Sequence, residues 1–136
     1  MPKFSQIIKV KSPPEKTWAI VGDLAGVNRW IPRITGVKIE GNKKRTCTFA
    51  DGHIQHEEII EYSSEKRSYS YTIERLQRIK NNRGTFAVKQ YGDGSVIMWE
   101  SEFDIINSAL EAEMTQMWKG ATAQIAESLR RLVEGK

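Results

Sequence analysis

The chain has 136 residues, 39% of them hydrophobic, and this length suits one domain that buries about two-thirds of its unfolded surface. A single cysteine, Cys47, excludes an internal disulfide and fits a reducing cytoplasm. The net charge of +4 falls short of the dense basic stripe of a nucleic-acid binder, and we expect neither a signal peptide nor a membrane-spanning segment, because no apolar run approaches roughly 18 residues.

The chain opens with the pattern of a strand followed by a helix. Residues 3–11 alternate in polarity and place three apolar side chains on one strand face, Phe4, Ile8 and Val10. Ser12 is then expected to cap a helix, with Pro13 at its first position and Glu15 completing a capping box. That helix should end near Gly22 or Asp23.

A second short helix and a long series of strands follow. Residues 24–33 predict the helix, which Pro32 closes because the residue before a proline disfavours helical geometry. Asp51-Gly52 and Gly92-Asp93-Gly94 are strong hairpin signals between strands. The alternating segments predict six strands, at residues 34–40, 45–50, 54–62, 67–74, 85–91 and 95–104.

The last thirty residues have a different period. From Ser108 onward the apolar residues recur at steps of three and four, which predicts a long amphipathic helix. Asn107 or Ser108 is its natural N-cap, and Arg130 and Arg131 in the last turn suit the helix dipole.

This order of elements, β-α-α-β6-α, defines an α+β domain over residues 1–136. A meander of six strands needs an apolar cover on one face, and the terminal helix is the element long enough to provide it. We therefore expect a curved, seven-stranded antiparallel sheet wrapped around the long helix. A cavity can open where the sheet curves away from the helix, and ligand sites are usually such concave, mostly apolar places.

At this point the chain resembles the START-like or SRPBCC helix-grip superfamily, and within it the polyketide cyclase/dehydrase and lipid transport family. The similarity covers essentially all 136 residues. Four stretches carry it: Ser12–Trp18, Asn28–Pro32 with its Trp-x-Pro pattern, Asp51-Gly52 with Glu57 and Ile59, and Val96–Phe103 centred on Trp99. The resemblance implies a hydrophobic-ligand cavity between sheet and helix, but no particular reaction, because fold alone does not fix function.

Glu57 is a candidate for holding a polar part of the ligand, as the resemblance suggests. The apolar residues Ile54, Ile60 and Tyr62 have the opposite parity on the strand, which favours a solvent-facing Glu57, although a bulge would reconcile the two patterns. Buried in an apolar cavity, Glu57 would be able to act as a general acid or base.

The other candidate ligand-binding residues lie on predicted strands and on the long helix. Trp30 belongs to the segment that relatives use at the cavity entrance, where it either gates the cavity or fills the core. Tyr71 offers a hydroxyl to a ligand, and Met114 with Met117 would form a pliable wall. The full set is Trp30, Glu57, Ile59, Tyr71, Ile73, Phe86, Val88, Trp99, Met114, Met117, Ala121 and Ile125.

The remaining polar clusters favour solvated surfaces. His53 and His56 are three apart on a predicted strand, so they point to opposite faces and do not form a metal site. The basic runs 43–45 and 75–83 are solubilising loop charges by the simplest reading, and they lack the interleaved aromatic residues that stack nucleic-acid bases. We expect no cofactor and assign no catalytic residue.

The sequence therefore predicts a cytoplasmic protein that binds a small hydrophobic or amphipathic ligand, such as a lipid, an isoprenoid or an aromatic polyketide-like compound. One alternative is a cyclase or dehydratase that uses a cavity carboxylate or tyrosine. Another is a protein-interaction or stress-related module whose cavity is incidental. The sequence leaves homodimerisation open.

Overall fold

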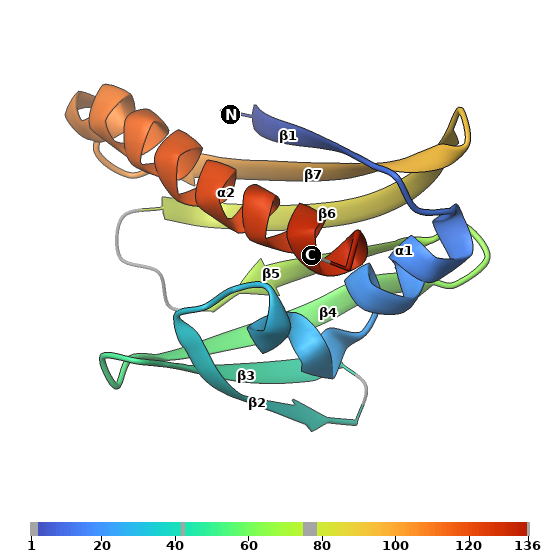
Figure 1. Cartoon of the computed structure of the whole chain (residues 1–136). Helices are drawn as coiled ribbons and strands as arrows, with labels where there is room; N and C mark the ends of the chain where they lie inside the picture. Colours follow the sequence, from blue (N-terminus) through green and yellow to red (C-terminus); the bar gives the residue numbers. More distant parts are fainter. Residues whose placement is uncertain (1–2, 42, 75–78, 136) are drawn as a thin grey trace.

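In the computed structural model, residues 3–41, 43–74 and 79–135 are described. One antiparallel sheet has the strand order β1-β7-β6-β5-β4-β3-β2, so the first strand joins the far end of the meander (Figure 1). The elements in chain order are β1 (Lys3–Val10), α1 (Pro14–Val21), the 3-10 helix η1 (Leu24–Arg29), β2 (Ile34–Glu40), β3 (Lys44–Phe49), β4 (Ile54–Ser63), β5 (Ser68–Ile73), β6 (Ile79–Tyr91), β7 (Gly94–Ile105), η2 (Ser108–Leu110) and α2 (Glu111–Val133).

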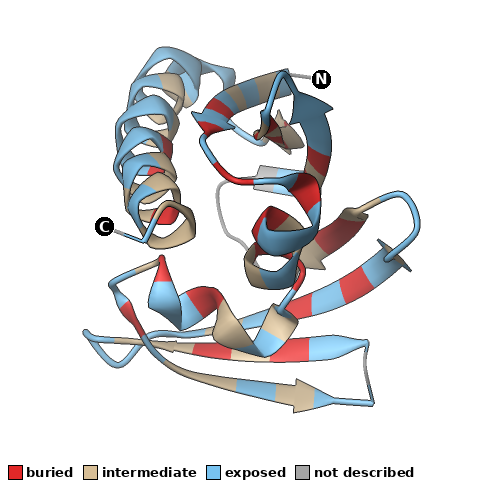
Figure 2. Cartoon of the chain, turned by 45° about the vertical axis from the view of Figure 1, so that its right-hand side comes forward, coloured by how far each residue is buried: buried red, intermediate tan, exposed pale blue. Residues whose placement is uncertain are grey.

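The predicted α+β helix-grip fold is confirmed. The long helix α2 lies across the curved sheet, with α1 and η1 at the end of the sheet where α2 finishes (Figure 1). Buried residues recur along the strands and on the helices, whereas most residues of α2 are exposed or half-buried (Figure 2). Among the described residues, no helix is long and apolar enough to cross a membrane.

The start of α1 differs from the prediction. The helix begins at Pro14, and Pro13 rather than Ser12 is the residue before it, with an extended backbone (ψ 155°). Pro13 itself precedes a proline, which disfavours the helical conformation and moves the boundary by one residue. Ser12 is instead buried, and its carbonyl oxygen accepts hydrogen bonds from Thr17 Oγ1 (3.3 Å) and Ser95 Oγ (2.5 Å).

The residues of α2 that face the sheet include a threonine, whereas Met117 on the predicted apolar stripe is exposed. Trp118, Thr122, Ile125 and Leu129 face the sheet, and Thr122 and Leu129 are the buried residues of the helix. Thr122 tolerates burial because its hydroxyl donates to the Trp118 carbonyl (2.7 Å) and accepts from Gln6 Nε2 (3.0 Å).

Candidate functional site

An internal hollow, here called the chamber, lies between the concave face of the sheet, η1 and α2. Its volume is about 200 Å³. Side chains from β3, β4, β5, β6 and β7 form its floor and walls, while Val27, Trp30, Ile31 and Ile125 close it from the helical side.

A wider hollow, here called the vestibule, adjoins the chamber on the outer side of the molecule. Its volume is about 520 Å³, and it lies between the segment after η1, the end of β3 and the middle of α2. Ile31, Phe49 and Ile125 line both spaces and so form the constriction between them. Arg33 and Gln124 stand at the outer part of the vestibule.

Aromatic rings form most of the chamber wall, with Phe86 at their centre. The Phe86 ring centroid lies 4.9 Å from that of Trp99, 5.4 Å from Trp30 and 5.5 Å from Tyr69. These spacings are typical of favourable stacked and edge-on aromatic pairs. The wall around Phe86 is therefore mostly apolar, although the three rings that pack on Phe86 each carry a polar group.

Gly84 on β6 makes room for the ring of Tyr71 on β5. The two residues are paired across the strands, and a Cβ at position 84 would lie 2.6 Å from the Tyr71 hydroxyl oxygen. Glycine at this position therefore allows the tyrosine ring to lie flat over the neighbouring strand and reach the chamber.

A buried ion pair forms the polar side of the chamber. Arg45 and Glu57 have side chains that are 4% and 5% exposed, and Glu57 Oε1 accepts from Arg45 Nε (2.7 Å) and Nη2 (2.6 Å). Glu57 Oε2 accepts from Gln55 Nε2, and Arg45 Nη1 donates to the Leu24 carbonyl oxygen (3.2 Å). Both carboxylate oxygens of Glu57 are thus occupied by donors from the protein itself.

The β3–β4 hairpin brings this pair together. Arg45 lies directly opposite Glu57 in the ladder, and the turn between the strands contains Gly52 with φ +90°, a value that glycine adopts freely. Arg45 was expected to be a solvated charge in the run 43–45, and this expectation was wrong. It shares the inward parity of Cys47, and its ion pair with Glu57 permits burial.

Strand β4 resolves the conflict over parity. Glu57 and Ile59 face inward, whereas Ile54 and Ile60 are exposed on the outer face. The register with β5 shifts between Ile59 and Glu61, so a bulge returns Tyr62 to the side of Tyr69, 6.3 Å away between ring centroids.

The electrostatics of the chamber leave it without net charge. Burial would lower the pKa of Arg45, but the neighbouring Tyr69 and Glu57 outweigh burial and hold that pKa above its ordinary value. Burial raises the pKa of Cys47 to about 11, and burial likewise raises the pKa values of Tyr69 and Tyr71. At neutral pH the thiol and both phenols are therefore uncharged, and the cation and anion of the pair cancel.

Three buried polar atoms among the described residues have no hydrogen-bond partner, and all belong to chamber-lining rings. They are Trp30 Nε1, Trp99 Nε1 and Tyr69 Oη. The Arg45 guanidinium interacts with Tyr69 and the Tyr71 hydroxyl with Trp99, but neither contact reaches hydrogen-bond geometry. A buried polar group without a partner costs about 1–3 kcal/mol.

The structure brings most of the candidate ligand-binding residues to one place. Ala121 lines the vestibule, and Ile125 lines both spaces. The candidates that line the chamber are Trp30, Glu57, Tyr71, Ile73, Phe86, Trp99 and Ile125.

Four other candidates line neither space. Ile59 and Val88 are buried in the core away from the chamber. Met114 is half-buried and Met117 is 58% exposed, because the inward stripe of α2 runs through Trp118, whose ring packs 5.2 Å from that of Phe4. The methionines therefore do not form the expected wall.

Eight further residues of the described part of the chain line the chamber, and they were not among the candidates predicted from the sequence. Most have the inward parity of predicted strands or belong to the segment around Trp30, so hairpin register is the signal that would have found them. They are Val27, Ile31, Ile34, Arg45, Cys47, Phe49, Gln55 and Tyr69.

The two histidines are separate and exposed. The His53 ring packs against Phe49 at 5.6 Å, and His56 Nδ1 lies 3.5 Å from Thr46 Oγ1. Within the described ranges, no group of three or more His, Cys, Asp or Glu residues is arranged to hold a metal. Part of the basic run 75–83, namely residues 75–78, lies outside the described residues.

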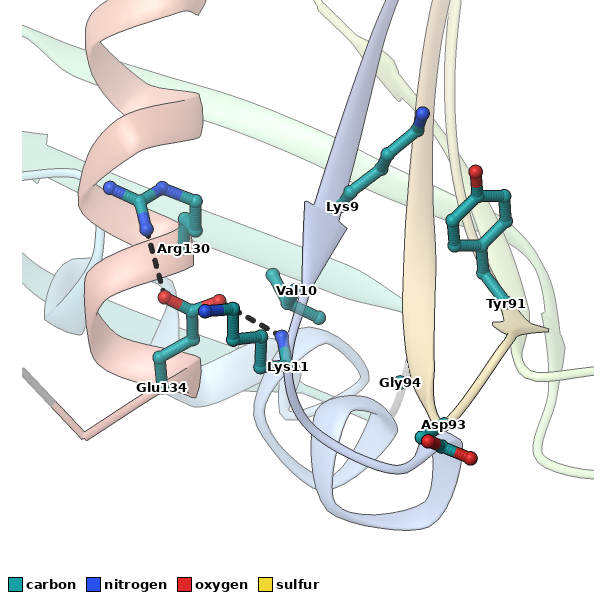
Figure 3. A pocket seen from close by; sticks show the side chains of 8 residues that line it. All are labelled: Lys9, Val10, Lys11, Tyr91, Asp93, Gly94, Arg130 and Glu134. Carbon is teal, nitrogen blue, oxygen red and sulfur yellow. Dashed lines mark hydrogen bonds and ion pairs between the residues drawn. The ribbon is translucent and has the colours of Figure 1, made fainter.

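A surface groove of about 600 Å³ lies at the C-terminal end of α2, between β1 and the β6–β7 hairpin (Figure 3). Arg130 Nη1 donates to Glu134 Oε1 (2.8 Å), and Glu134 Oε2 accepts from the Lys11 backbone nitrogen (2.9 Å). Lys9 Nζ lies 4.9 Å from the Tyr91 ring centroid. These polar groups bind one another, and the contacts of Glu134 join the last turn of α2 to the end of β1.

A curved sheet gripping one long helix over an internal chamber defines a helix-grip protein. The chain belongs to the polyketide cyclase / dehydrase and lipid transport family, whose model matches residues 1–134.

Known relatives share either sequence or fold with the chain. MLP-like protein 423 of Arabidopsis thaliana is 31% identical over an alignment of 114 positions, and the match covers 71% of this chain and 72% of that protein. The structure of XoxI from Bacillus cereus superposes with a TM-score of 0.88 at 20% identity and covers 98% of this chain and 96% of its own. The di-domain ARO/CYC protein BexL superposes with a TM-score of 0.87 at 15% identity, covering 98% of this chain and 47% of its own.

Proposed function

We propose that this protein binds a small, mostly apolar molecule in the chamber between the sheet and α2. The observation that carries the proposal is an aromatic-walled hollow of about 200 Å³ that shares three lining residues with a vestibule of about 520 Å³. Concave, mostly apolar sites with a few convergent polar groups are the usual form of a small-molecule site. The single buried cysteine supports a cytoplasmic location for this binding.

The size of the chamber limits the part of the ligand that it encloses. An apolar cavity of about 150 Å³ binds benzene, so the chamber accommodates one substituted ring. A lipid, an isoprenoid or a polyketide-like molecule would extend through the constriction at Ile31, Phe49 and Ile125 into the vestibule. Burial of about 150 Å² of ligand surface contributes roughly 4 kcal/mol.

A cyclase or dehydratase reaction in the same chamber is the second candidate, which the family description favours. Glu57 Oε1 accepts hydrogen bonds from Arg45 and Oε2 accepts one from Gln55, so donors of the protein itself hold this carboxylate in place. The raised pKa of Tyr71 keeps its hydroxyl neutral, so it donates a hydrogen bond more readily than it removes a proton. These groups support binding and orientation more strongly than acid–base catalysis.

Native mass spectrometry of protein from its natural source tests the proposal, with Ile125→Trp to obstruct the constriction. We expect a co-purified small molecule on the wild type and its loss from Ile125→Trp. Ala123→Trp, on an exposed position of the same helix, is the matched control and should retain the molecule. An empty wild-type protein that a panel of small ring compounds and fatty acids does not stabilise would contradict the proposal.

A further inference from the structure

The unpartnered polar groups of the chamber identify the chemistry of its ligand. Buried polar atoms in proteins are almost always hydrogen-bonded, and exceptions require an explanation. Here the exceptions are Trp30 Nε1, Trp99 Nε1 and Tyr69 Oη, which are carried by three side chains that line one hollow. Such clustering indicates that the partner is a molecule bound in the hollow.

The three groups belong to side chains that line one small space. Their rings surround Phe86, with centroids 4.9–5.5 Å from its own. A ligand of one ring with a substituent fits the chamber of about 200 Å³, which all three side chains line.

The two indole nitrogens can only donate hydrogen bonds, and the Tyr69 hydroxyl can donate one as well. The two indoles therefore require acceptors. The carboxylate that would compete as an acceptor, Glu57, is already occupied by Arg45 and Gln55. The chamber thus offers donors in excess, and a ligand displaces its water without loss of hydrogen bonds only if it brings acceptor oxygens.

The absence of a net charge in the chamber narrows the class of ligand further. Arg45 and Glu57 form a contact ion pair, so neither charge is left to bind an oppositely charged ligand. A carboxylate or ammonium ligand would lose its hydration without a counter-charge, which disfavours its entry.

We propose that the chamber selects a neutral aromatic molecule with a carbonyl oxygen, whose two lone pairs accept hydrogen bonds from the indole nitrogens of Trp30 and Trp99. This inference rests on the proposed function and names the ligand class of the same site. The aromatic part stacks within the wall around Phe86, and the carbonyl oxygen supplies the missing acceptor.

Matched probes test this selection on the wild-type protein. Acetophenone carries a carbonyl group, isopropylbenzene has nearly the same shape without an acceptor, and benzoate adds a negative charge. Their dissociation constants are measured by isothermal titration calorimetry and ligand-observed NMR at pH 7. We expect acetophenone to bind and benzoate to bind at least tenfold more weakly. Tighter binding of benzoate would overturn the neutral-ligand inference.

Conservative variants then test the named donors. Trp30→Phe and Trp99→Phe each remove one donor and keep an aromatic ring, so each should raise the dissociation constant of acetophenone about two- to tenfold. The dissociation constant of isopropylbenzene should change less than twofold, since this probe makes no hydrogen bond. Trp18→Phe, at a half-buried tryptophan that does not line the chamber, is the control.

The outcomes separate this inference from the proposed function. If both probes bind the wild type and the variants affect them equally, the donors do not select the ligand, and the inference fails while the binding function stands. If neither probe binds and no molecule co-purifies, the binding function itself fails. Loss of acetophenone affinity alone in the Trp30 and Trp99 variants supports the inference.

Discussion

Glu57→Gln should destabilise the protein strongly although it preserves the size of the side chain. The substitution removes the partner of Arg45, a residue that is 3% exposed and lies 5.8 and 5.6 Å from the ring centroids of Tyr69 and Tyr71. Breaking a buried ion pair from one side costs about 3–5 kcal/mol, because the remaining charge stays buried without compensation. With an unfolding entropy of about 2.1 cal/mol/K per residue, this cost lowers the Tm by roughly 10–17 °C.

Urea unfolding at pH 7, followed by circular dichroism, measures this effect. Glu58→Gln removes the same charge from the adjacent, exposed position and should stay within about 0.5 kcal/mol of the wild type. The double variant Arg45→Leu with Glu57→Leu should recover most of the loss, because it removes both charges together. A Glu57→Gln protein within about 1 kcal/mol of the wild type would refute the claim that the pair is buried and mutually dependent.

Three further predictions concern stability. Gly120→Ala should raise the free energy of unfolding by about 0.5–1 kcal/mol, because a Cβ there meets open space on α2; an unchanged urea midpoint would contradict it. Gly84→Ala should lower the free energy of unfolding by about 1–3 kcal/mol, because the new Cβ meets the Tyr71 ring. The same substitution should cost less when it is made in a Tyr71→Ala protein, which lacks that ring. The folded Cys47 thiol, with its pKa raised by burial from 9.0 to about 11, keeps its proton at a higher pH than the unfolded thiol. Its stabilising effect is therefore present below pH 9 and lost between pH 9 and 11, so the urea midpoint should fall less over that range in Cys47→Ala than in the wild type.

The hairpin of β3 and β4 shows how far local sequence reasoning reaches. The Asp51-Gly52 turn and both strands are predictable, and an antiparallel pairing about that turn places residue 45 opposite residue 57. Opposite charges at these positions therefore carried the signal for the buried ion pair. A basic run read one residue at a time conceals it, because Lys43 and Lys44 are exposed neighbours of a buried Arg45.

The long helix shows where such reasoning fails. Its existence follows from the spacing of apolar residues, but the buried stripe depends on what the sheet presents to it. Thr122 is buried because Gln6 on β1 supplies a hydrogen bond, a contact between residues 116 positions apart in the chain. An apolar scale places Met117 inside and Thr122 outside, and tertiary hydrogen bonding reverses that order.

The buried ion pair has a consequence for binding that an apolar pair would lack. Apolar replacements of buried ion pairs are often neutral or stabilising, so such a pair contributes little net stability. The pair does fix the side chain of Arg45, which donates a hydrogen bond to the Leu24 carbonyl oxygen and so connects β3 to η1. Trp30 follows directly after η1. The pair therefore holds one wall of the chamber in place while neutralising its own charge. In this arrangement the orientation of a ligand is left to the indole and phenol donors, which explains how a site with a buried arginine and glutamate selects an uncharged molecule.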